Sequence, residues 1–406
     1  MPDAPGASRH VEPTPGPLNG ISVLELPAIG PVPFLGMLLA DLGAEVIRID
    51  RLNPGVDPLT TILGPTGPLG RGRRSVALDL RQPAGAAVAL DLVAGMDVLI
   101  EGFRPGVAER LGIGPKQALE RNPRLVYGRM TGWGQDGPQA RTAGHDITYL
   151  AVSGLLHGIG PAVGPPTPPA NYIGDFGGGA MSLAVGLLAA VLSARSTGAG
   201  QVVDASMVDG AAYLATMVRT LHGHGLWRDE RQANIFDGGV PHYRCYTCSD
   251  GRYVAVGALE PKFWDELLTT LGLDPATTPS PLDPGHAAEL VDLLAGIFAG
   301  RPRDEWAELF AGSDACVAPV LTLAEAPEHP NNQARGSYVE VAGVQVASPV
   351  PRFSATPATV AGPPPALGAD TEQVLTELGY SAGRLAELRA AGVLGNTEEA
   401  PRIPGN

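Results

Sequence analysis

The chain has 406 residues, of which 44% are hydrophobic and 17% charged, with 54 glycines and 40 prolines. This length predicts two domains, and the composition is that of a globular protein, which excludes a disordered or fibrous chain. Acidic residues outnumber basic ones by 42 to 28, a formal net charge of −14, and this balance argues against nucleic acids and membrane surfaces as partners.

The cysteines and the N-terminal residues indicate the compartment. Cys245, Cys248 and Cys316 are too few for a disulfide framework in a chain of this size, which favours a reducing environment. Residues 1–18 have an acidic residue near the start and no apolar run, so we expect a disordered leader and neither a secretory signal nor a transit peptide. The sequence therefore predicts a cytoplasmic protein.

Short apolar runs alternate with helical stretches from Ile21 onward. This alternation is typical of a mostly parallel sheet covered by helices, that is, of an α/β fold with a Rossmann-like sheet. We assign residues 19–228 to this large domain. The predicted strands are 21–26, 44–50, 75–80, 97–103 and 125–130, with helices at 31–43, 84–94 and 115–121.

Two unusual stretches follow the last of these strands. The tract 158–170 combines prolines, which disfavour regular structure, with glycines, which permit tight turns, and predicts an active-site loop or lid. Residues 176–194 carry no charge over 19 residues, near the length that spans a bilayer. Because they are rich in Gly, Ala and Ser, we expect a buried core helix. A further strand and helix are predicted over 200–218.

The sequence changes character after residue 228. A hairpin is predicted around Ser249–Gly251, followed by an amphipathic helix from Glu260 and helices at 287–299 and 303–312. We assign 229–325 to a smaller α+β domain, and 326–406 to a return to the large domain with a C-terminal helix and tail. Cys245 and Cys248 with the nearby His242 offer too few ligands for zinc, so no metal is expected.

The first β-α-β unit superficially fits a nicotinamide site, because Asp50 ends its second strand. The turn after the first strand offers only Gly30, however, where the dinucleotide motif needs three glycines. Arginines instead gather near the strand ends, and guanidinium groups there suit the phosphates of a ligand such as coenzyme A. The alternative, solvated surface arginines, stays open. The cluster comprises Arg48, Arg51, Arg71, Arg73, Arg74, Arg104 and Arg110.

Seven ordered motifs give the sequence a specific resemblance. In chain order they are DLGAEVIRIDR, DVLIEGFRPGVAERLGIG, RMTGWGQDGP, AGHDITYLAVSG, IGDFGGGA, GQVVDASMVDG and VAVGALEPKFW. From about Leu18 to Leu394 the chain resembles the alpha-methylacyl-CoA racemases, which belong to the family III CoA-transferases of CaiB/BaiF type. The resemblance implies an isomerase of fatty acid metabolism that inverts the carbon next to the thioester of a 2-methylacyl-CoA, with no cofactor beyond the coenzyme A of its substrate.

The same resemblance implies the catalytic residues. His145 of the GHD motif and Asp175 of the GDFGGG motif match the two acid/base residues, and Glu260 of the VGALEP motif matches a partner of the histidine. Inversion by 1,1-proton transfer needs a base on one face of the carbon and an acid on the other. By themselves, these residues could equally be loop or helix-capping positions. We expect free amides near Gly177–Gly179 to face the thioester oxygen and to favour an ionised Asp175.

The resemblance also implies the coenzyme site. Its arginines would meet phosphates, and its leucine segment would border the adenine or ribose through backbone groups. The stretch 52–72 and the tract around Pro161 depart from the family by their Gly and Pro content. Both are expected to border the acyl channel, which leaves the chain length of the substrate open. The coenzyme residues are Arg51, Leu78, Asp79, Leu80, Gly102, Phe103, Arg104, Arg110 and Tyr149.

Two other functions compete with the racemase. In a CoA-transferase, Asp175 would be the nucleophile that takes up the acyl group as an anhydride, and a catalytically silent CoA-binding protein would keep only the fold. His145 and Glu260 favour proton transfer over both. The family forms interlocked homodimers, so the resemblance implies that Glu260 of one chain reaches the His145 and Asp175 of the other.

Overall fold

The computed structural model describes residues 16–52, 67–341 and 343–395. The predicted leader, except for its end at 16–18, and most of the stretch 52–72 lie outside the described residues. The chain divides into two compact units, which are treated separately below. The first takes residues up to 150, 170–214 and the residues from 336 on; the second takes 151–169 and 215–335. The predicted small domain, 229–325, lies within the second unit.

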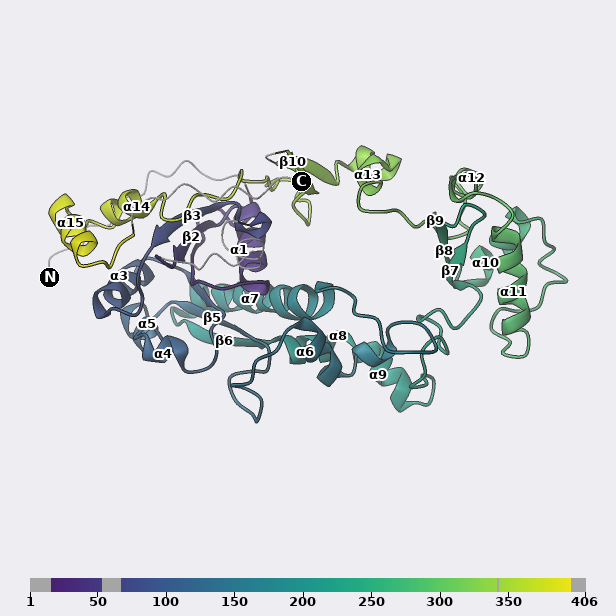
Figure 1. The fold of residues 1–406 in the computed structure, drawn as a ribbon, viewed down its shortest axis with the longest axis horizontal. Coiled ribbons are helices and arrows are strands. Elements are labelled where there is room, and N and C mark those ends of the chain that lie inside the picture. The colour runs from purple at the N-terminus through teal and green to yellow at the C-terminus, as the bar shows by residue number, and fades with distance from the viewer. Residues whose placement is uncertain (1–15, 53–66, 342, 396–406) are drawn as a thin grey trace. The chain divides into compact units, whose positions relative to one another are not determined.

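A six-stranded sheet forms the centre of the first unit (Figure 1). Every neighbouring pair is parallel, and the strand order is β3-β2-β1-β4-β5-β6. This order confirms the predicted Rossmann-like sheet. The order in which strands are added to the sheet reverses between β1 and β4. Parallel α/β sheets bind ligands at the carboxyl ends of the strands beside such a switch point. The strands are β1 (Ser22–Glu25), β2 (Glu45–Asp50), β3 (Arg73–Ala77), β4 (Val98–Glu101), β5 (Val126–Thr131) and β6 (Gln201–Ser206).

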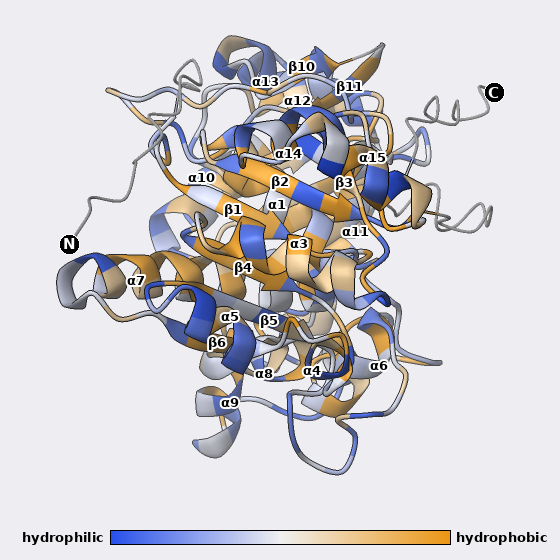
Figure 2. Cartoon of the chain, turned by 90° about the vertical axis from the view of Figure 1, so that its left-hand side faces the viewer, coloured by the Kyte–Doolittle hydropathy of each residue, from blue (hydrophilic) through white to orange (hydrophobic). Residues whose placement is uncertain are grey.

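Helices cover both faces of this sheet. Several begin with proline in the first turn, where its missing N–H group costs no hydrogen bond. The strands β1 and β4 are largely hydrophobic, whereas β2 combines hydrophobic with charged residues (Figure 2). The elements are α1 (Pro31–Asp41), η1 (Pro68–Gly70), α3 (Pro83–Val93), α4 (Val107–Arg110), α5 (Pro115–Arg121), α6 (Asp146–Ser153), η3 (Tyr172–Met181), α7 (Ser182–Thr197), α8 (Met207–Leu214), α14 (Thr371–Glu377) and α15 (Ala382–Ala390).

The uncharged stretch forms the π-helix η3 and the α-helix α7. One face of α7, with Leu183, Leu187 and Val191, is buried in the core that also contains Val126 and Met130 of β5. The opposite face is exposed. By length and composition alone, Tyr172–Thr197 is the one helix among the described residues that could cross a membrane, although soluble core helices pass the same test. The predicted core helix is therefore confirmed for one face only.

Buried ion pairs hold the sheet to its connections. Arg73 on β3 pairs with Glu25 on β1 at 3.1 Å, with both side chains at most 1% exposed. A Cβ atom on Gly36 of α1 would lie 2.0 Å from Glu25 Oε2, so only glycine leaves room for this pair. Two further buried pairs are Arg48–Asp50 at 2.9 Å and Arg71–Asp41 at 2.6 Å. These three arginines are buried in ion pairs. For them, both the predicted contact with a phosphate and the alternative of a solvated surface position are wrong.

The C-terminal segment closes the outer edge of β3. The Asp370 carboxylate accepts the amide of Ser75 at 2.7 Å, and Thr371 Oγ1 accepts the amide of Ala77 at 3.0 Å. The amides of Asp370 and Gly395 donate in turn to carbonyl oxygens of β3. An edge strand exposes unpaired backbone groups unless another segment covers them. The last helices are therefore part of the sheet domain.

The second unit has a three-stranded antiparallel sheet packed against helices. The predicted hairpin is confirmed: β7 (Tyr243–Thr247) and β8 (Tyr253–Gly257) flank the predicted turn, and β9 (Val317–Pro319) pairs with β8. Trp264, Phe298 and Trp306 lie in its core. Its helices are η2 (Leu156–Gly158), α9 (Thr216–Gly223), α10 (Pro261–Thr270), α11 (Ala287–Phe298), α12 (Arg303–Leu309), η4 (Ala326–Glu328) and α13 (Pro330–Arg335), and a separate hairpin, β10 (Tyr338–Val341) with β11 (Val344–Ala347), follows in the first unit.

Loss of the Asp370 carboxylate tests the closure of β3. Asp370→Ala leaves the Ser75 amide without its acceptor, so we expect the free energy of unfolding to fall by about 1–3 kcal/mol in urea denaturation. Glu372→Ala, which removes only an exposed pair with Arg389, is the control and should stay within about 0.5 kcal/mol of the parent. Equal effects of the two substitutions would contradict the proposed closure.

Candidate active site

His145 lies immediately before α6, in a backbone fixed by Thr148. The His145 amide donates to Thr148 Oγ1 at 3.0 Å, and the Thr148 hydroxyl donates to the His145 carbonyl at 2.7 Å. The Thr148 amide also donates to that carbonyl, at 2.8 Å. This local capping arrangement holds the start of the helix. The His145 side chain is exposed in the chain and available for chemistry.

Asp175 lies in the first turn of η3. This π-helix begins at Tyr172, ahead of the aspartate, and extends to Met181. Gly177–Gly179 therefore lie inside the helix and are not free first-turn donors, which corrects the expected role of their amides. π-helical segments are rare and occur frequently at functional sites. The aspartate is half-buried.

The glycines of the GDFGGG motif instead permit close packing of two helices. A Cβ atom on Gly178 would lie 2.6 Å from the amide nitrogen of Ala211 on α8. A Cβ atom on Gly210 would lie 1.8 Å from the carbonyl oxygen of Gly178. Side chains at these positions would force the helices apart. The packing of η3 on α8 explains why small residues occupy both motifs, and it fixes the helix that carries Asp175.

Asp146 connects the segments of the two predicted catalytic residues. It follows His145 directly, is 7% exposed, and its Oδ1 accepts the amide of Asp175 at 2.7 Å. A Cβ atom on Gly174 would lie 2.4 Å from the same oxygen, so the glycine leaves room for the carboxylate. The structure thus brings the segments of His145 and Asp175 together, and the charge of the histidine acts on the aspartate.

The pKa of Asp175 is raised above its ordinary value. Burial is the largest cause, and the negative charge of Asp146 adds to it. A hydrogen bond from Asn171 Nδ2 to Asp175 Oδ2, at 3.3 Å, and the charge of His145 act in the opposite direction. Because the pKa of Asp175 is raised overall, the expectation that its surroundings favour the ionised carboxylate is wrong.

Two functional residues of this site, Asp146 and Asn171, were missed by the sequence reasoning. Asp146 is part of the GHD motif, but its motif position does not reveal a hydrogen bond to a segment 29 residues away. Asn171 lies four residues before Asp175, at the helical spacing that places two side chains on one face. That spacing was the available signal. The start of α1 also borders the site, since Asp175 Oδ2 lies 3.4 Å from the Cβ position of Gly30.

Seven of the nine predicted coenzyme residues directly follow the carboxyl end of a strand, whereas Arg110 ends α4 and Tyr149 lies in α6. Arg51, Leu78–Leu80 and Gly102–Arg104 directly follow β2, β3 and β4. The side chains of Arg51, Arg104 and Arg110 are exposed. Neither Arg104 nor Arg110 forms an ion pair within the described parts of the chain. These two arginines are thus available for an anionic ligand, unlike the buried arginines of the sheet.

Few groups of the segment Leu78–Leu80 are available to contact a ligand. The side chains of Leu78 and Leu80 are buried in the core, and the amides of Leu78 and Asp79 already donate to the carbonyls of Asp50 and Val393. Any contact of this segment with adenine therefore uses other backbone groups. Tyr149 is 6% exposed, and burial, reinforced by the charge of Asp175, raises its pKa to about 12.

Glu260 occupies the N-cap position of α10 in the second unit. Its side chain is exposed and makes no capping hydrogen bond. Pro261 follows at the first helical position, where proline is favoured. The catalytic role of Glu260 stays a prediction. Among the described residues, no group of three His, Cys, Asp or Glu side chains is arranged to hold a metal ion.

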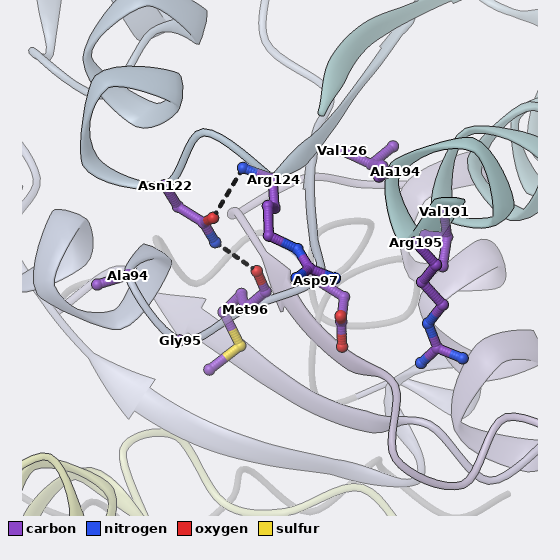
Figure 3. Close-up of a pocket in the computed structure, with 10 residues that line it drawn as sticks. All are labelled: Ala94, Gly95, Met96, Asp97, Asn122, Arg124, Val126, Val191, Ala194 and Arg195. Atoms are coloured by element: carbon purple, nitrogen blue, oxygen red, sulfur yellow. Dashed lines mark hydrogen bonds between the residues drawn. The ribbon is translucent and has the colours of Figure 1, made fainter. Parts of the chain in front are cut away.

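A small pocket of about 200 Å³ lies at the amino ends of β4 and β5, at the end of the strands opposite to the predicted coenzyme residues (Figure 3). It is lined by residues that precede β4 and β5 and by the last turns of α7. Asn122 joins its walls, donating to the Met96 carbonyl at 2.7 Å and accepting the Arg124 amide at 3.1 Å. None of the predicted site residues lines it, so the pocket is separate from the predicted catalytic residues.

The chain belongs to the CoA-transferase family III, whose family model matches residues 18–371. Among its relatives, the chain is 43% identical to the alpha-methylacyl-CoA racemase of Mus musculus over 378 residues, covering 92% of this chain and 96% of that protein. It is 42% identical to the racemase of Homo sapiens over 375 residues, with the same coverage. It is also 32% identical to a succinyl-CoA–D-citramalate CoA-transferase of Chloroflexus aurantiacus, over 94% of this chain and 98% of that one.

A solved structure has the same fold. A CaiB/BaiF family protein from Brucella suis matches with a TM-score of 0.76 at 27% identity, covering 90% of this chain and 100% of that chain. The likeness extends over nearly the whole of both chains, so it includes both units.

Removal of an exposed arginine tests the coenzyme site. Arg104→Ala should weaken binding of free coenzyme A about 10-fold to 100-fold in isothermal calorimetry, because a charged hydrogen bond contributes about 1.5–3 kcal/mol. The control is Arg74→Ala, since Arg74 already pairs with Glu45 and Glu377; its affinity should not change. If both variants and the parent bind coenzyme A with equal affinity, Arg104 is not part of the coenzyme site.

Proposed function

We propose that this protein is a 2-methylacyl-CoA racemase that inverts the carbon next to the thioester through an enolate. The observation that carries the proposal is the connection made by Asp146, which brings the segments of two acid/base groups, His145 and Asp175, together. The high identity to proteins named alpha-methylacyl-CoA racemase supports it.

The chemistry requires two groups of opposite protonation. One residue removes the α-proton from one face, and the other delivers a proton to the opposite face. Their roles reverse for the other enantiomer. The pKa of Asp175 is raised, which brings it closer to the ordinary pKa of an imidazole. General acid–base catalysis is most efficient when the pKa of each group lies near the working pH.

The start of α6 offers donors for the enolate oxygen. A helix leaves its first amides without partners inside the helix, and here these belong to Asp146 and Ile147, next to His145. The positive end of the helix dipole adds to their effect. Fixed donors of this kind stabilise negative charge that develops in the transition state. In this proposal the substrate is an acyl-CoA whose phosphates meet Arg104 and Arg110, and no further cofactor takes part.

We also propose a homodimer in which Glu260 pairs with the His145 of the partner. Exposed apolar side chains of the first unit support an interface: Val185 and Leu192 on α7 and Tyr213 on α8 are 69%, 70% and 80% exposed. Large exposed apolar surfaces are typical of interaction sites. The three free cysteines support a reducing compartment, and we propose the cytoplasm.

A CoA-transferase is the second candidate, because a relative with that activity in its name is 32% identical over almost the whole chain. In that reaction Asp175 would attack the thioester as an ionised nucleophile. Burial disfavours the ionised form of this carboxylate. The GHD histidine beside it also has no role in anhydride formation, so proton transfer accounts for more of the site.

Exchange in deuterated buffer distinguishes the two. One enantiomer of a 2-methylacyl-CoA, incubated without an acceptor acid, should take up α-deuterium and lose optical activity together. His145→Ala and Asp175→Asn should each slow racemisation by about 10²-fold to 10⁴-fold, the usual contribution of a general acid or base. His224→Ala, at an exposed position of the second unit, is the control. If no exchange occurs, but CoA is transferred once a carboxylic acid is added, the racemase proposal is wrong and Asp175 acts as a nucleophile.

A further inference from the structure

We infer that Asp146 is a positioning residue: its carboxylate fixes the backbone of Asp175 and places a second negative charge within electrostatic range of the Asp175 side chain. This inference rests on the proposed racemase function and deepens it. Neither the family resemblance nor the sequence motifs assign such a role to this side chain.

The first support is the buried geometry of the carboxylate. Asp146 is 7% exposed, and its Oδ1 accepts the amide of Asp175 at 2.7 Å. Its Oδ2 is buried and has no hydrogen-bond partner among the described residues. Burial of an unpaired polar oxygen costs free energy. An asparagine would accept the same amide without a charge, so anchoring alone does not explain why a carboxylate occupies this position.

The second support is the set of charges around Asp175. From α6, Asp146 opposes the ionisation of Asp175, while His145 favours it. Asn171, just ahead of η3, donates a hydrogen bond to Asp175 and favours the ionised form. Tyr149 of α6 lies within electrostatic range of Asp175, and Arg104, after β4, within range of Tyr149. Asp146 is thus the one acidic neighbour among these groups that raises the pKa of Asp175 through its charge.

The consequence for catalysis follows from the balance of the two proton carriers. A carboxylate with an ordinary pKa is a weak base and rarely holds the proton that the return reaction needs. When Asp146 is ionised, its negative charge makes Asp175 a stronger base and keeps the protonated form of Asp175 accessible. Burial raises the pKa of Asp146 itself, while hydrogen bonds from the backbone of Asp175 and Gly174 act against this rise. Asp146 therefore serves both directions of the racemisation, because each direction uses Asp175 in the opposite role.

The test is the pH dependence of kcat/KM for α-proton exchange in the full-length protein. Asp146→Asn keeps the acceptor for the Asp175 amide but removes the negative charge. Asp175 then loses its proton more easily, so the acid limb of the profile should move to lower pH. Asp146→Ala also removes the charge and should move the limb in the same direction. It also releases the Asp175 segment, and kcat should fall by a further factor of about 10², the cost of a misplaced catalytic group.

Asn171→Leu and Asp136→Asn complete the design. Asn171→Leu removes a hydrogen bond to the ionised form, so the acid limb should move to higher pH. Asp136→Asn removes a negative charge from an exposed position of the same unit and should leave the profile in place. An unmoved acid limb in both Asp146 variants, with kcat reduced in Asp146→Ala, would show a purely structural residue and overturn the inference. Failure of the proposed function is distinguishable, because the parent protein would then show no exchange at any pH.

Discussion

The hydrogen bond from the Asp175 amide to the Asp146 carboxylate is the contact on which the candidate site depends. It joins two segments 29 residues apart in the sequence and holds the start of the helix that carries Asp175 against the residue that follows His145. Gly174 leaves room for it, and the contact of Gly178 with Gly210 fixes the π-helix from the other side. Glycines in two motifs, IGDFGGGA and GQVVDASMVDG, thus allow the backbones to approach closely and fix the position of the helix that carries Asp175.

The sheet supplies the frame for this contact and divides the arginines between two tasks. Arg48, Arg71 and Arg73 are buried in ion pairs that tie the strands to their connections, where the loss of one partner would leave a buried charge uncompensated. Arg104 and Arg110 are exposed after the carboxyl end of β4. The C-terminal segment covers the outer strand β3, so the last helices belong to the same unit as the predicted coenzyme residues.

Much of the fold could be predicted because its signals are local. Alternating runs of apolar and helical residues identified strands β1 to β6, and the turn residues around Gly251 identified the hairpin. The separation of the arginines was not predictable, since Arg73 finds Glu25 across 48 residues and only the folded sheet makes that pair. The start of η3 at Tyr172 was missed for a similar reason, because its packing on α8 is a long-range contact. The motifs identified His145 and Asp175 but not Asp146 and Asn171, whose roles arise from hydrogen bonds between or within folded segments.

The central claim is that His145 and Asp175 act on opposite faces of the same carbon. The most direct measurement is α-proton exchange by His145→Ala and Asp175→Asn with each enantiomer of a 2-methylacyl-CoA separately, because a single remaining base reaches the proton on one face only. We predict that each variant exchanges the proton of one enantiomer without inverting it, and that the two variants choose opposite enantiomers. Exchange of the same enantiomer by both variants, or racemisation by either variant at the rate of the parent protein, would contradict the two-base account.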